Sequence, residues 1–80
     1  MEWKNRIVSD PSILMGKPTV NGTRLAVGFL LDVFAQGWTK EQVLRNYPQL
    51  SEDDLRAVFA YSAARVGDEE VTPLKPGAKS

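Results

Sequence analysis

Apolar side chains recur at helical spacing from residue 27 onward. The first run places apolar residues at positions i, i+3, i+4 and i+7, which form one face of a helix: Val27, Leu30, Leu31 and Phe34. Gly37 follows in the C′ position, where a left-handed backbone is favoured, so we predict a helix over residues 27–36. Phe29 and Val33 fall on the opposite side. This helix is therefore apolar nearly all round, and we expect it to be buried on more than one side.

Two further helices are predicted between residues 39 and 67. Thr39 followed by Gln42 is a capping-box pattern, and the helix that begins there must end before Pro48. Ser51 is a suitable N-cap for the third helix. Acidic residues fill the first turn of that helix, where the helix dipole favours negative charge: Glu52, Asp53 and Asp54. Apolar side chains then continue at helical spacing until Gly67, which we expect to close the helix.

The N-terminal third carries strand and turn patterns instead. Residues 6–9 form a short candidate strand. Asn21-Gly22, between residues 17–20 and 23–26, predicts a hairpin with positive φ at both turn positions. Because Pro18 has no N–H to donate, its strand is either an edge strand or begins at that proline. A two-stranded hairpin is marginal alone, so it must pack on the helices, pair with Ile7-Val8 or pair with another subunit.

These elements predict a mainly α fold, in which a short N-terminal β-hairpin or strand element precedes a helix-turn-helix-like core of three helices. We expect one domain over residues 1–67, with the β element in residues 1–26 and the helices in residues 27–67. Residues 68–80 carry an acidic triplet, two prolines and few apolar side chains, which is typical of a flexible tail.

A homodimer is expected because a chain of 80 residues can bury only a small core. Domains of this size often gain their missing stability by association. The expected seam combines the first strand, the second apolar side of the first helix and the alanine side of the third: Ile7, Val8, Phe29, Val33, Ala60 and Ala64.

Composition excludes several kinds of chemistry. The chain has no Cys and no His, which excludes disulfides, thiol catalysis, the serine triad and the usual zinc sites. The acidic run Glu52–Asp54 could be considered as a metal site, but its place at a helix N-terminus explains it better. We therefore expect a non-enzymatic protein without metal, cofactor or small-molecule substrate. The longest apolar block, residues 25–35, is too short to span a bilayer, and no signal peptide is recognisable, so a cytoplasmic protein is expected.

Charge is segregated although the net charge is zero. Residues 1–26 have a net charge of +2, because four basic residues outnumber Glu2 and Asp10: Lys4, Arg6, Lys17 and Arg24. These four side chains are candidate contacts to the phosphates of DNA. The alternative is an ordinary solvated hairpin. Direct DNA reading by the third helix is disfavoured, because its acidic first turn would face the phosphates.

Several ordered motifs in residues 3–67 resemble a bacterial family catalogued as a domain of unknown function, family 433. The resemblance rests on Arg6 to Pro11, Gly16-Lys17-Pro18, Asn21 to Arg24, Ala35 to Thr39, Tyr47-Pro48 and Asp53 to Ala57. It implies a helix-turn-helix-like, antitoxin-like protein that binds a partner toxin of the PIN-like ribonuclease class and represses its own operon by binding operator DNA. The alternative is a homodimeric protein-interaction module that does not bind DNA.

The C-terminal residues are the predicted toxin contact. Three carboxylates and two apolar side chains suit a basic groove such as the RNA channel of a ribonuclease: Asp68, Glu69, Glu70, Val71 and Leu74. The alternative is a solvated C-terminus without a partner.

Overall fold

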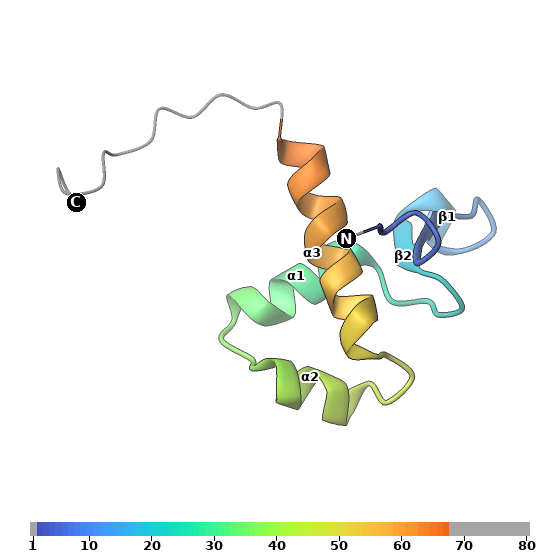
Figure 1. The fold of residues 1–80 in the computed structure, drawn as a ribbon. Coiled ribbons are helices and arrows are strands. Elements are labelled where there is room, and N and C mark those ends of the chain that lie inside the picture. The colour runs from blue at the N-terminus through green and yellow to red at the C-terminus, as the bar shows by residue number, and fades with distance from the viewer. Residues whose placement is uncertain (1, 68–80) are drawn as a thin grey trace, which may run out of the picture.

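Residues 2–67 form a small antiparallel sheet followed by three helices (Figure 1). The structure, a computed structural model, describes residues 2–67. Its elements are β1 (Ile7–Ser9), a 3-10 turn (Leu14–Gly16), β2 (Pro18–Val20), α1 (Val27–Ala35), α2 (Lys40–Asn46) and α3 (Glu52–Val66). The prediction of a mainly α fold with a short N-terminal β element is confirmed. No helix in the described part of the chain is long and apolar enough to cross a membrane.

Local capping defines the helix ends as the sequence predicts. The Thr39 side chain accepts a hydrogen bond from the Gln42 backbone N–H, and the Gln42 side chain accepts one from the Thr39 backbone N–H, which completes a capping box. Ser51 and Asp54 form a second capping box at α3. Gly37 has φ of +100° and ends α1 in the left-handed region. Gly67 closes α3 directly after Val66, as predicted, although its φ of −64° is right-handed.

The predicted hairpin is only partly formed. Strand β2 pairs with β1 in an antiparallel register that places Ile7 opposite Val20, and Pro18 begins the strand. The expected second arm, residues 23–26, contributes only one bridge, from Ala26 to Thr19. Of the two turn residues, Gly22 alone has positive φ, at +83°. The turn is therefore not the mirror-image type that the sequence predicts.

Side-chain hydrogen bonds of Thr23 explain why the second arm leaves the sheet. Its hydroxyl donates to the Val20 carbonyl at 2.8 Å and accepts from the Leu25 backbone N–H at 3.0 Å. These bonds compete with a strand ladder and turn the chain toward α1. The sequence pattern alone does not reveal this competition.

The core lies between the sheet, α1 and α3. It is formed by ten buried residues, mostly aliphatic: Ile7, Val20, Val27, Leu30, Val33, Val43, Leu50, Leu55, Ala57 and Val58. Helix α1 contacts both β2 and α3, which agrees with its apolar character on two sides. The Trp3 ring packs edge-on against Tyr61 of α3, with 4.9 Å between the ring centroids. This contact holds the N-terminal segment beside α3 (Figure 1).

Candidate functional site

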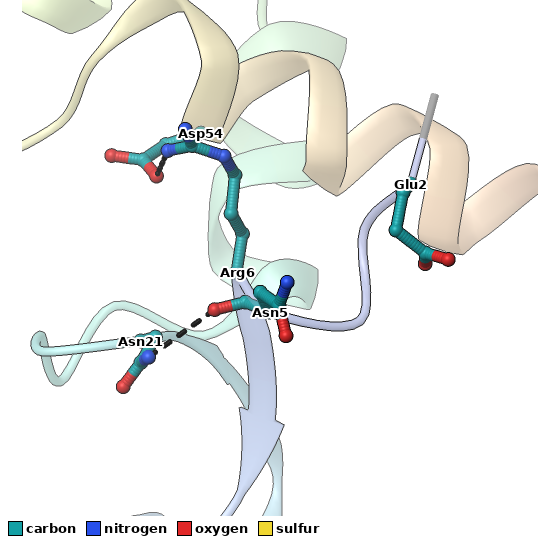
Figure 2. Close-up of a pocket in the computed structure, with 5 residues that line it drawn as sticks. All are labelled: Glu2, Asn5, Arg6, Asn21 and Asp54. Atoms are coloured by element: carbon teal, nitrogen blue, oxygen red, sulfur yellow. Dashed lines mark hydrogen bonds and ion pairs between the residues drawn. The ribbon is translucent and has the colours of Figure 1, made fainter.

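Arg6 joins the sheet to the start of α3. It immediately precedes β1, and Figure 2 shows its side chain extending toward Asp54. Its Nη1 donates to Asp54 Oδ1 at 3.0 Å, and its Nη2 lies 3.7 Å from Asp53 Oδ2. These contacts border a polar hollow of about 370 Å³ that is also lined by Glu2, Asn5 and Asn21. The hollow is bounded by fixed polar groups, because the Asn21 side-chain amide donates to the Asn5 carbonyl.

The same contacts offset part of the negative charge at the α3 N-terminus. Asp54 accepts from the Ser51 backbone N–H through Oδ2 and from Arg6 through Oδ1, so both of its oxygens are used. Arg6 is therefore engaged by two carboxylates within the chain. As a phosphate contact, the role predicted for it, Arg6 would have to leave these partners.

The other three basic candidates are exposed, and one of them, Lys17, lies away from Arg6. Lys4, Lys17 and Arg24 all have exposed side chains. The strand register pairs Ser9 with Pro18, so Lys17 lies at the opposite end of the sheet from Arg6. The structure thus does not unite the four predicted cations in one cluster within a single chain.

The predicted dimer seam is divided between the core and the surface. Ile7 and Val33 are buried inside this chain, because they pack with Leu30 and Val20 in its own core. Val8 and Ala60 are half-buried, whereas Phe29 and Ala64 are exposed. A second copy therefore cannot contact Ile7 and Val33 without opening the core. The predicted toxin contact, Asp68 to Leu74, lies outside the described residues.

An apolar groove that sequence reasoning missed lies across β2, α1 and α3. It consists of two adjoining hollows of about 660 and 260 Å³ that share Pro18, Gly28 and Leu31. We call it the Gly28 groove. Phe29 lines one hollow, together with Lys17 and Asp32, and Val66 lines the other. The apolar residues on two sides of α1 indicate in the sequence that one side could form a groove. Which side stays open depends on how α1 packs against the sheet and α3.

The loop between β1 and β2 is closed by its own polar groups. Asp10 accepts from the Ser12 backbone N–H at 2.9 Å and from the Ser12 hydroxyl at 2.8 Å. These two hydrogen bonds hold the pKa of the Asp10 carboxyl below its usual value. Asp10 thus works as a turn-forming anion. Within residues 2–67, no group of three or more acidic side chains is arranged to hold a metal ion.

Comparison with known proteins places the chain in a family. A family model described as "Protein of unknown function (DUF433)" matches residues 7–62. The chain is also similar to the crystal structure of a DUF433 member protein from Anabaena variabilis, with 33% sequence identity and a TM-score of 0.69. That similarity covers 72% of this chain and 57% of the Anabaena protein, so this chain spans less than two thirds of its relative's length. No curated protein matches. Because the family model covers both strands, α1, α2 and all but the end of α3, the chain belongs to the DUF433 family.

Proposed function

We propose that this chain is a non-enzymatic protein-binding module of the antitoxin type. The observation that carries the proposal is the apolar surface left on its helices. Phe29, Phe59 and Val66 are 43%, 47% and 55% exposed. Phe29 and Val66 line the Gly28 groove, and exposed apolar side chains beside a groove are typical of surfaces that bind other proteins. The whole chain also lacks His and Cys, the side chains most often used for acid–base and nucleophilic catalysis.

The proposed partner is a ribonuclease of the PIN-like class, as the resemblance to family 433 suggests. Its contact is the sequence from Asp68 to Leu74, which continues directly from the exposed end of α3 at Val66. Three carboxylates in this segment match the charge of RNA phosphates, and Val71 and Leu74 add apolar contacts.

Inhibition of RNA cleavage tests this proposal. The PIN-like ribonuclease encoded beside the gene is purified, and its cleavage of RNA is measured with the full chain, with a chain ending at Gly67 and with a matched chain ending at Leu74. We expect the full chain and the Leu74 form to inhibit equally. The Gly67 form should need at least a tenfold higher concentration, which corresponds to about 1.4 kcal/mol. An adjacent gene that encodes no such ribonuclease, or cleavage that excess full chain leaves unchanged, contradicts the antitoxin role.

Operator DNA is a second candidate ligand, supported by the exposure of Lys4, Lys17 and Arg24. Fluorescence anisotropy with the upstream DNA, repeated over a range of salt concentrations, measures the number of phosphates neutralised. Replacing Arg24 with Ala should lower the salt slope. Replacing Arg6 with Ala should leave the slope unchanged, since Arg6 is held by Asp54. Affinity and slope that survive Arg24→Ala would refute contact at this residue.

A further inference from the structure

A strained turn projects a methionine from the loop between β1 and β2. Leu14, Met15 and Gly16 have φ of +50°, +58° and +84°, so three successive residues are left-handed and two of them are not glycine. A left-handed conformation costs a non-glycine residue about 1–2 kcal/mol. The turn is nevertheless held, because the Gly16 backbone N–H donates to the Ile13 carbonyl at 3.0 Å and the Ser9 hydroxyl donates to the Gly16 carbonyl.

The turn carries an exposed apolar side chain. Met15 is 93% exposed, and the loop that carries it lies at the outer edge of the sheet, on the side away from α2 (Figure 1). Strained backbone of this kind tends to persist where a side chain must be presented in a fixed direction. Methionine is well suited to filling an irregular apolar recess.

The Gly28 groove is such a recess, and it begins directly after the turn. Lys17 and Pro18 line the groove and follow Gly16 in sequence. Gly28 leaves the groove open, because a Cβ at this position would meet nothing within 4 Å. Met15 does not line the groove of its own chain. A groove and an unfilled apolar projection therefore lie next to each other on one molecule.

Charges at the groove make it self-complementary. Lys17 and Asp32 both line the larger hollow, and neither forms an ion pair with another residue in the range 2–67. In a contact related by a twofold axis, a residue pair occurs twice: if residue i of one copy meets residue j of the other, then residue j of the first copy also meets residue i of the second. Lys17 of each copy would then face Asp32 of the other, giving two equivalent opposite-charge contacts.

We propose that the occupant of the Gly28 groove is a second copy of this chain. Met15 of each copy enters the groove of the other, and Lys17 pairs with Asp32 across a twofold axis. This arrangement replaces the predicted seam of Ile7 and Val33, which the core of each chain already uses. The proposal rests on the proposed function only in that it treats the chain as a protein-binding module.

Sedimentation equilibrium of the full chain tests the proposed dimer. At tens of micromolar protein, we expect twice the 8.9 kDa mass of one chain. Met15→Glu should weaken dimerisation at least tenfold while circular dichroism stays unchanged, because the side chain has almost no contacts to lose. A wild-type chain that sediments as a monomer at this concentration overturns the proposal, and so does a Met15→Glu variant that dimerises as strongly as wild type.

Charge reversal tests the twofold pairing separately. Lys17→Glu and Asp32→Lys should each weaken dimerisation at least tenfold at low salt, and the double variant should recover to within threefold of wild type. Arg45→Glu and Glu41→Lys on α2 are matched controls, because they change the net charge equally at exposed residues that do not line the groove. Controls that weaken the dimer as much, or a double variant as weak as the single ones, would refute the pairing.

The ribonuclease assay distinguishes the two proposals. If the Met15→Glu variant is monomeric and still inhibits the ribonuclease, both proposals are supported, and toxin binding does not depend on the dimer. A dimer disrupted by Met15→Glu, together with a ribonuclease that the wild-type chain does not inhibit, removes the antitoxin role and leaves the dimer.

Discussion

The contact between Arg6 and Asp54 should contribute measurably to folding stability. Arg6 Nη1 lies 3.0 Å from Asp54 Oδ1, and the two side chains are 40% and 15% exposed. A buried hydrogen bond between charged groups contributes about 1.5–3 kcal/mol. Since Arg6 is partly exposed, solvent screening reduces the expected coupling to about 1 kcal/mol.

A double-mutant cycle isolates this coupling. The substitutions are Arg6→Met, Asp54→Asn and both together. Asparagine at position 54 keeps a carbonyl oxygen that can accept from the Ser51 N–H, so the capping box of α3 can persist while the charge is lost. Asp53, at 3.7 Å from Arg6, is unchanged throughout, so the cycle reports on Asp54 alone. The free energy of unfolding is measured by urea denaturation, followed by circular dichroism, for all four proteins.

The Lys40–Glu52 pair is the matched control. Its Nζ and Oε1 atoms are 3.3 Å apart, and the side chains are 50% and 58% exposed. An exposed pair of this kind contributes about 0.3 kcal/mol, and salt weakens it further. A coupling between Arg6 and Asp54 no larger than that of the control would show that Arg6 does not hold the sheet to α3. Arg6 would then be available to contact DNA, contrary to the expectation above.

Three further outcomes are expected. In the Met15→Glu background, where the proposed dimer is weakened, Gly28→Ala should raise the free energy of unfolding by about 0.5 kcal/mol in urea denaturation, because Gly28 is helical and has open space around it. Gly37→Ala should lower it by about 1 kcal/mol, because φ is +100° there. The Ser12 amide proton should titrate in NMR spectra with a midpoint below 3.8, since its hydrogen bond lowers the pKa of Asp10. That bond stabilises the loop above pH 3.8 and is lost as the pH falls through the lower, folded-state pKa.

The helices could be predicted from sequence because the residues that define their ends are close together in the chain. Thr39 and Gln42 are three residues apart and form the capping box that their order suggests. The apolar spacing in α1 likewise reports directly on which residues can share a face. Structure that depends on neighbours within about four residues is visible in one sequence.

Pairing between distant segments stayed open in the sequence, because pairing with Ile7-Val8 was one of three possibilities for the hairpin. The Asn21-Gly22 turn suggested that β2 pairs mainly with the residues after it, whereas β2 pairs with β1. Hydrogen bonds of the Thr23 hydroxyl favour this outcome, because they take up the Val20 carbonyl and the Leu25 N–H, which a second ladder would otherwise use. The turn type also differs from the predicted one, because, of Asn21 and Gly22, only Gly22 has positive φ.

Charge along the chain was the least reliable guide to the surface. The excess of basic residues in the first 26 suggested one phosphate-binding face, but Arg6 pairs with a carboxylate 48 residues later. If Lys17 also pairs with Asp32 across the proposed dimer, two of the four candidate cations in residues 1–26, Lys4 and Arg24, stay available for DNA in each copy. Neutralising about four phosphates per dimer gives a slope of about −3.6 in a plot of log affinity against log salt concentration, compared with about −7 if all four cations of each copy took part. A slope near the larger value would therefore show that DNA competes with both the Arg6–Asp54 contact and the proposed dimer for the same side chains.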